Sequence, residues 1–502
     1  MKNQAINPFL PLKYCIPDGE PHVFGDRVYL FGSHDVEGGE RYCQGGDYLC
    51  FSAPVDDLSA WRCDGVIYES SQDPDAKEGC EDLYAPDVVR GNDGRYYLYY
   101  TLSGDNGAGF STPISVAVCD TPSGKYRYLG KVRNPDGTPF LKYITADPAL
   151  LNDDGTIRLY YGWSLSLVCG AANSGGVPDR EPKLVPKNYL RPVEKMLFKR
   201  SDEELDALEH DVMGAFEVEL CDDMLTVKSQ PMPIAPGQFS CLGTSFEYHA
   251  FYEAASCRKI GNKYYFIYSS QESNELCYAT SDYPDRDFVY GGTIISNGDV
   301  GYMGRLPEDR LNMTANNHGS LEEINGQWYI FYHRQTHSST FSRQACAEPV
   351  TINPDGSIDQ VECTTQGMNL KPLEAAGEYS AAYCCNLTNG KMPHITNRKI
   401  DADIPYISND GDERFVKNMG DGSTMTFKYF KFEKETDLII KYRGDEGALE
   451  VILGNERVGE VNLTKCDSWQ KAKLKLKAAG EKSLTLKYLG NGKIDVLSIL
   501  FE

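Results

Sequence analysis

The sequence has little positive charge, few tryptophans and no long apolar run. Only 50 of its 502 residues are lysine or arginine, against 73 aspartates and glutamates, so the formal net charge is −23. This deficit disfavours binding to nucleic acids or anionic membranes, because both depend on lysine and arginine. No stretch reaches the roughly 18 apolar residues of a membrane span. We therefore expect a protein that binds neither nucleic acid nor a membrane, and whose ligand is neutral or cationic.

Several signals that would point to other classes are also missing. Residues 1–8 contain no apolar core of a secretory signal. The 16 cysteines show no metal-finger spacing, and their one close pair is Cys384-Cys385. No glycine-rich phosphate loop, zinc-type cluster or Ser-His-Asp set stands out. A disulfide framework stays open, but thiols in a reducing compartment fit this cysteine usage better, so we expect a cytoplasmic protein.

A repeat and an abundance of aromatic residues stand against these absences. The chain holds 33 tyrosines and 20 phenylalanines, residues that favour strands. A glycine followed by an aromatic strand recurs five times, at Gly25, Gly94, Gly155, Gly261 and Gly326. A unit of about 65 residues holds roughly four strands, the size of a propeller blade.

The repeat predicts an all-β fold, with a five-bladed β-propeller over residues 1–360. The long interval between the third and fourth glycines requires an insertion, which we place at about 165–213. Its last part, 200–213, has a helical pattern.

Each repeat also carries one polar residue seven or eight positions before its glycine. These residues are Asp18, Asp87, Asp147, Glu253 and His318. Because the first strand of each blade lines the central channel, equivalent positions should converge there. A turn role would explain any one of them, but not all five in phase. Carboxylates gathered in a channel can bind a cation or transfer protons. Glycoside hydrolysis uses two, one protonated and one ionised.

With these motifs in place, residues 1–355 resemble glycoside hydrolase family 43, inverting enzymes on a five-bladed propeller. The matching segments are Ile16-Pro17-Asp18, Ala146-Asp147-Pro148-Ala149-Leu150 and Phe251-Tyr252-Glu253-Ala254. The resemblance implies that Asp18 is the general base, that Glu253 is the general acid, and that Asp147 tunes and orients this acid. Glu20 competes for the base role, but the distance of Asp18 from its strand favours Asp18.

The resemblance extends to three further segments. Tyr84-Ala85-Pro86-Asp87 is similar to a second-blade segment with a structural acid, and Asn317-His318-Gly319-Ser320 to a fifth-blade segment near a bound calcium. It therefore implies Ca²⁺ at the propeller centre, with His318 as a metal ligand, and no organic cofactor. Ser342-Arg343-Gln344 is similar to the site of an arginine that contacts the sugar. The predicted substrate-binding residues are Tyr84, Asp87, Trp163, His34, Phe251 and Arg343.

After residue 367 the repeat ends, and short strands with polar turns follow. Apolar residues recur at period two in two stretches, Met425, Phe427 and Tyr429, and Leu484, Leu486 and Tyr488. We expect a β-sandwich (jelly-roll) domain over 368–502. Its layout resembles a family 6 carbohydrate-binding module. Trp469 is its single tryptophan, so a purely structural sandwich docked on the propeller stays open.

The family resemblance implies an inverting, exo-acting glycosidase. Its products would be terminal α-L-arabinofuranosyl or β-D-xylosyl residues from plant cell-wall oligosaccharides, namely arabinan, arabinoxylan and xylan fragments. A cytoplasmic location favours exo action, because polymers cannot enter a cell whereas imported oligomers can. An endo-arabinanase and a non-catalytic sugar-binding propeller stay open. The choice between arabinose and xylose, and assembly into a homo-oligomer, stay open too.

Overall fold

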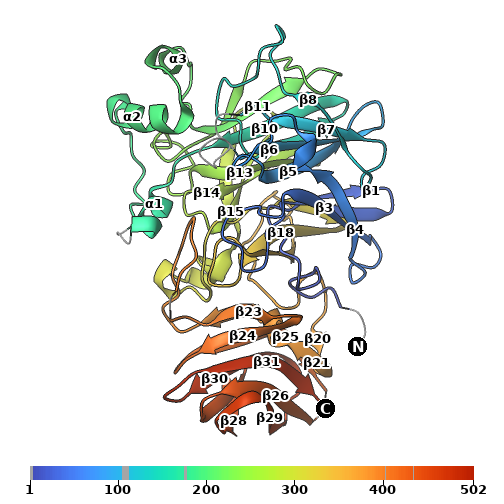
Figure 1. The fold of residues 1–502 in the computed structure, drawn as a ribbon, viewed down its shortest axis with the longest axis vertical. Helices are drawn as coiled ribbons and strands as arrows, with labels where there is room; N and C mark the ends of the chain where they lie inside the picture. The colour runs from blue at the N-terminus through green and yellow to red at the C-terminus, as the bar shows by residue number, and fades with distance from the viewer. Residues whose placement is uncertain (1–3, 104–111, 175–177, 402, 434) are drawn as a thin grey trace.

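The computed structural model describes residues 4–103, 112–174, 178–401, 403–433 and 435–502. In Figure 1 the propeller sheets, blue to yellow, lie together above the C-terminal sheets, orange to red. Helices, drawn in green, project from one edge of the propeller. Among the residues described, no helix is both long enough and apolar enough to cross a membrane.

Five antiparallel sheets follow one another along the first part of the chain. Each adds its strands in sequence order, four in the first four sheets and three in the fifth, counted over the described residues. The strands are β1 (Glu20–Phe24), β2 (Arg27–Phe31), β3 (Asp47–Pro54) and β4 (Arg62–Glu69); β5 (Leu83–Arg90), β6 (Tyr96–Leu102), β7 (Ser115–Cys119) and β8 (Arg127–Lys131); β9 (Ala149–Asp153), β10 (Thr156–Trp163), β11 (Gly214–Leu220) and β12 (Met232–Pro236); β13 (Phe251–Ile260), β14 (Lys263–Ser270), β15 (Glu275–Ser281) and β16 (Val289–Ser296); and β17 (Leu321–Ile324), β18 (Gln327–Gln335) and β19 (Arg343–Val350).

The repeat glycines mark the same turn in every sheet. Each lies between the first and second strand of its sheet, with φ between 61° and 96°. This left-handed conformation strains residues that carry a Cβ, which explains why the repeat keeps glycine there. The first strands pack side by side, and a parallel bridge between Gly19 and Gly319 joins the first sheet to the fifth. The sheets therefore close into a β-propeller.

The predicted insertion lies between β10 and β11 and is helical, with residues 175–177 outside the described part. It contains α1 (Leu167–Ser174), α2 (Lys187–Phe198) and α3 (Asp202–Asp206). The helix expected over 200–213 is wrong in extent, because α3 has five residues and the longer α2 precedes it. Pro192 lies inside α2, and a proline in this position argues against a helix when the sequence is read alone. Tertiary packing outweighs this proline, since Phe198 and Leu197 join an apolar cluster with Trp163.

Two six-stranded sheets form a C-terminal β-sandwich around one apolar core. The first contains β20 (Leu373–Glu374), β25 (Thr424–Phe432), β30 (Gly480–Leu489), β27 (Gly447–Leu453) and β28 (Glu456–Leu463), with β22 (Asn386–Thr388) beside β25; the second contains β23 (Tyr406–Asp410), β24 (Glu413–Met419), β31 (Ile494–Phe501), β26 (Thr436–Gly444) and β29 (Cys466–Leu476), with β21 (Gly377–Ser380) beside β31.

The predicted alternation of buried residues holds in β30 but breaks in β25. Phe427 is buried, yet the pairing with β30 shifts register between Phe427 and Phe430. Phe430 is therefore the next core residue, and the expectation for Tyr429 is wrong. The bulge turns Tyr429 toward the propeller, where its hydroxyl donates to Glu362. The neighbouring Lys428 forms an ion pair with Glu362 at 2.9 Å.

This register shift predicts which aromatic residue stabilises the sandwich. Replacing the buried Phe430 by alanine should lower the free energy of unfolding by about 3–5 kcal/mol, because it leaves a cavity among aromatic neighbours. Tyr429→Ala, at the position that strict alternation would bury, should cost clearly less. Denaturant unfolding of both variants measures the difference, and equal losses would contradict the bulge.

Candidate active site

Most of the in-phase polar residues lie where the first strand of a sheet begins. Asp18 and Asp147 lie just before β1 and β9, His318 lies before β17, and Glu253 is near the start of β13. Asp18 has φ 57°, Asp147 has φ 47° and Ala254, after Glu253, has φ 65°. Such left-handed conformations cost about 1–3 kcal/mol each outside glycine and cluster at functional sites.

A buried guanidinium holds Asp18. Arg343, the first residue of β19, is 2% exposed, and its Nη1 donates to Asp18 Oδ1 at 2.8 Å. Its Nε and Nη2 donate to the two oxygens of Asp35 at 2.8 and 3.0 Å. The Tyr42 ring lies 4.7 Å from the guanidinium. The two-pronged contact with Asp35 fixes the plane of Arg343, and Arg343 in turn orients Asp18.

A neutral histidine, His333, contacts the backbone of Asp18. The Asp18 backbone N–H donates to His333 Nδ1 at 3.3 Å, so the opposite ring nitrogen, Nε2, carries the proton that binds Asn316 O at 2.8 Å. Burial, helped by Arg343, lowers the pKa of His333 to about 3. His333 therefore stays uncharged at neutral pH and positions the backbone of Asp18 without adding charge.

The pKa values of the two predicted proton-transfer groups are shifted in opposite directions. Burial alone would raise the pKa of Asp18, but Arg343, then His318, outweigh it and bring this pKa below its ordinary value. Burial, then the negative charges of Asp147 and Asp18, raise the pKa of Glu253 to about 8. At neutral pH Asp18 is therefore ionised and Glu253 protonated. A base and an acid separated in this way are what glycoside hydrolysis requires.

Asp147 contacts the backbone next to Glu253. Its Oδ2 accepts a hydrogen bond of 2.9 Å from the N–H of Ala254, the residue after Glu253. Strand β13 shifts register on both sides of Glu253, as strands often do beside active sites. His318 Nδ1 lies 4.0 Å from Asp147 Oδ2 and 3.9 Å from Asp18 Oδ1. The structure thus brings Asp18, Asp147, Glu253 and His318 together around one point.

Three of the predicted substrate-binding residues lie at or beside this group. Tyr84, in β5, is close enough to Tyr42 and Arg343 for electrostatic interaction. Trp163 ends β10 and its ring centroid is 5.9 Å from that of Tyr252, the neighbour of Glu253. Arg343 is the guanidinium described above. His34, in contrast, is engaged through Nδ1 with Asp47 at 2.6 Å.

Two predicted sugar contacts require correction. Phe251 is fully buried and packs with Phe266 and Tyr268, so it has no surface for a ligand and is a core residue. Asp87 is also fully buried, and its oxygens accept from His22 Nε2, taken as the donor, and from Leu150 N, both at 2.6 Å. Its role is to tie neighbouring sheets together, because both oxygens are already satisfied.

Sequence reasoning missed the residues that support the site, chiefly Asp35 and His333. A buried arginine requires a carboxylate partner, and this rule could have prompted a search for one. However, Asp35 and Arg343 are 308 residues apart, so no local spacing reveals the pair. Nor does the His333-Arg334 sequence distinguish a buried histidine from a strand end.

Comparisons with known proteins point to one enzyme family. The model of the glycosyl hydrolases family 43 matches residues 7–170. A xylosidase/arabinosidase of Thermoclostridium stercorarium is 40% identical over 516 residues, covering 99% of each chain. The chain belongs to glycoside hydrolase family 43. A second relative with that description, from Bacteroides ovatus, is 27% identical and covers 70% of this family 43 chain and 97% of its own.

Solved family 43 structures share the fold. A Bacillus subtilis arabinoxylan arabinofuranohydrolase, in complex with cellotetraose, has a TM-score of 0.50 at 18% identity and covers 100% of this chain and 98% of its own. A β-xylosidase/α-arabinofuranosidase from a compost microbial metagenome, in complex with xylotriose and in a calcium-free form, has a TM-score of 0.50 at 23% identity. It covers 72% of this chain and 98% of its own. At these identities the likeness shows the fold alone.

The donor groups at the propeller centre offer little to a calcium ion. Calcium takes about six to eight oxygen ligands. Among the described residues there, Glu20 Oε1 is a buried carboxylate oxygen without a hydrogen-bond partner. The other oxygen of Glu20 already binds Arg258 at 3.0 Å, and both oxygens of Asp87, which forms one cluster with Glu20 and His22, already accept hydrogen bonds. A calcium ion here would depend on Glu20 Oε1, His318 and water, next to a permanent positive charge.

The opposite pKa shifts predict a pH profile. Activity should fall as pH rises through about 8, where Glu253 loses its proton, and fall in acid as Asp18 gains one below its ordinary pKa. Asp147→Asn should move the alkaline limb to lower pH, because the Asp147 charge helps Glu253 keep its proton. Measurements of kcat/KM against pH test this, with the exposed Asp154→Asn as control. An unmoved alkaline limb in Asp147→Asn would count against the assignment.

Proposed function

We propose that the chain is an inverting, exo-acting glycosidase that releases terminal α-L-arabinofuranosyl or β-D-xylosyl residues from oligosaccharides of arabinan, arabinoxylan or xylan. The observation that carries the proposal is the pair of carboxyl groups with opposed pKa shifts, Asp18 and Glu253, in one buried cluster. The sugar class is supported by the descriptions of the relatives, which are xylosidases/arabinosidases.

In the proposed mechanism each group has one task. Glu253 donates its proton to the glycosidic oxygen as the bond to the anomeric carbon breaks. Asp18 removes a proton from the water that attacks the opposite face, so the configuration inverts. Asp147 keeps Glu253 protonated and, through Ala254 N, fixes its backbone. Glu20 is the weaker choice of base, because it is paired with Arg258 and burial raises its pKa.

Two other functions remain distinguishable by experiment. A non-catalytic sugar-binding propeller would bind the same oligosaccharides without releasing a product. An endo-arabinanase would cut within chains and release oligomers instead of single sugars. The product spectrum from linear and branched oligosaccharides therefore separates all three, and oligomers as the sole products would favour the endo-acting alternative.

Acid and base variants should respond differently to the leaving group. Asp18→Asn should lower kcat/KM by about 10²–10⁴-fold on every substrate. Glu253→Gln should lower kcat/KM by as much on natural oligosaccharides. On nitrophenyl glycosides the decrease in kcat/KM should be much smaller, because a nitrophenolate departs without protonation. Glu323→Gln, an exposed glutamate of β17, serves as control. NMR of the first-formed sugar should show the inverted anomer, and retention would refute the mechanism.

We propose that residues 1–360 carry catalysis and that the sandwich, 368–502, is a fixed support for the active-site loops. Arg414 of β24 forms an ion pair with Glu37 at 2.7 Å, on the loop that continues from Asp35. His337 N donates to Ile407 O at 2.9 Å, on the segment before Arg343. The sandwich thus holds both chain segments that contribute to the Arg343–Asp35 contact.

The sandwich's single tryptophan is a poor sugar platform. The Arg443 guanidinium lies 4.4 Å over the Trp469 ring, and Phe415 packs edge-on at 5.6 Å. The Trp469 Nε1–H donates to Glu413 at 2.9 Å. These contacts favour support of the propeller over carbohydrate binding at Trp469. The 16 cysteines, all free thiols in the structure, are consistent with the proposed reducing, cytoplasmic setting.

The support role predicts that a distant ion pair affects catalysis. Arg414→Met should lower kcat/KM, by up to about 10²-fold if the Glu37 loop moves by 1 Å. Lys465→Met removes an exposed cation of the sandwich and should leave kcat/KM unchanged. Trp469→Ala should leave binding to insoluble xylan unchanged. If Trp469→Ala loses binding to insoluble xylan while Arg414→Met keeps a normal kcat/KM, the sandwich would instead be a carbohydrate-binding module.

A further inference from the structure

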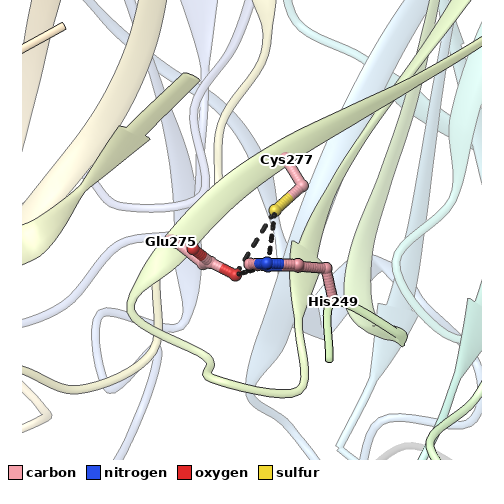
Figure 2. A group of neighbouring side chains, drawn as sticks. All are labelled: His249, Glu275 and Cys277. Carbon is pink, nitrogen blue, oxygen red and sulfur yellow. Dashed lines mark hydrogen bonds and ion pairs between the residues drawn. The ribbon is translucent and has the colours of Figure 1, made fainter. Parts of the chain in front are cut away.

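A second cluster of reactive side chains lies in the fourth sheet and includes neither Asp18 nor Glu253. His249 precedes β13, while Glu275 and Cys277 are the first and third residues of β15 and so lie on one face of that strand. Figure 2 shows the three side chains pointing toward one another. His249 Nδ1 is 2.7 Å from Glu275 Oε1 and 4.0 Å from Cys277 Sγ, and this sulfur is 3.4 Å from the same oxygen.

Neighbouring groups hold the three donors in place. Ser270 Oγ donates to Glu275 Oε1 at 2.5 Å, and Thr293 Oγ1 donates to Glu275 Oε2 at 2.9 Å. The Tyr290 ring stacks on the His249 ring at 4.7 Å and 8°. Cys277 is fully buried, whereas 32% of the His249 side chain is exposed. The cluster is therefore preorganised, with one side open to solvent.

A nucleophilic cysteine does not explain the arrangement. In such sites the acid and the thiol contact different nitrogens of the histidine, but here both face Nδ1. Burial and the adjacent Glu275 charge also keep the pKa of Cys277 well above its ordinary value, the opposite of thiolate activation. One nitrogen, one oxygen and one sulfur directed at a common point instead form a donor set for a borderline transition-metal ion.

We propose that His249 Nδ1, Glu275 Oε1 and Cys277 Sγ bind a divalent, thiophilic metal ion, with Zn²⁺ as the first choice. The metal joins all three donors and takes water as its fourth ligand. The thiol proton leaves to solvent, as does the imidazolium proton where His249 carries one. The resulting thiolate and carboxylate neutralise the two positive charges, which matters for a site this buried.

The place of this site indicates a structural role. Tyr268 OH donates to the His249 carbonyl at 2.7 Å, and Gln271 N to that of Ala250 at 2.8 Å, so the segment entering β13 is already tied to β14. A metal would add a link from this segment to β15, four residues before Glu253. Its binding is independent of the proposed glycosidase reaction, and can be measured without substrate.

The test uses the full chain, reduced and stripped of metal, with Co²⁺ and Zn²⁺ as probes. We expect one Co²⁺ per chain to give a thiolate-to-cobalt charge-transfer band, which Zn²⁺ then abolishes by competition. Zn²⁺ should raise Tm, and a chelator should reverse the rise. Wild-type protein that shows neither a band nor a Tm shift at saturating metal would overturn the proposal.

Matched variants assign the effect to these side chains. Cys277→Ala and His249→Phe should each abolish the band and the Tm shift, and the phenyl ring keeps the stack on Tyr290. Cys63→Ala, which removes a half-buried cysteine of β4, should keep both. A band that persists in Cys277→Ala would refute the site. If that variant fails to fold, Cys277→Ser takes its place, because serine keeps the size of the side chain and supplies no thiolate for the charge-transfer band.

Discussion

The guanidinium of Arg343 is shared between two buried carboxylates, and the rest of the site depends on this contact. A cation with 2% exposure is stable only with close counter-charges. Asp35 takes two of its N–H groups and fixes its plane, which leaves Nη1 for Asp18. Asp18 is thereby kept ionised. Glu253 lies among the same charges, but its nearest strong influences are burial and Asp147, so its proton is retained. Arg343 beside Asp18, and burial with Asp147 around Glu253, thus move the pKa values of two carboxyl groups apart.

The propeller makes this separation possible by gathering short strand ends from different sheets. Asp18, Asp147, Glu253 and His318 come from four sheets, and each lies at or near the start of an innermost strand. The left-handed backbone at Asp18, Asp147 and Ala254 is the local cost of turning these side chains toward the axis. The sandwich contacts the two loops that the first and fifth sheets contribute, through Arg414 and the His337 backbone.

The sequence was sufficient to predict the sheets that repeat along the chain and the strands with regular apolar alternation. The five glycines gave the phase of the sheets, and that phase singled out the carboxylates, because one turn geometry recurs in each sheet. It failed where a local irregularity or a distant partner decides. The bulge in β25 reverses the facing of Tyr429, and packing of the strand that carries Glu253 buries Phe251. Asp35 and His333 acquire meaning only from Arg343 and Asp18, which no interval along the chain reveals.

The contact between Asp18 and Arg343 joins positions 325 residues apart, and this separation has a consequence for biogenesis. Such distant pairing makes folding slow, because a long loop must close before the contact is gained. On the ribosome, the first sheet emerges long before the strand that brings its counter-charge. Until β19 is synthesised, Asp18 and Asp35 share no cation, and a full desolvation of both is unfavourable. The contact between Asp18 and Arg343 can therefore form only after the fifth sheet has joined the first, and its formation reports that the ring has closed.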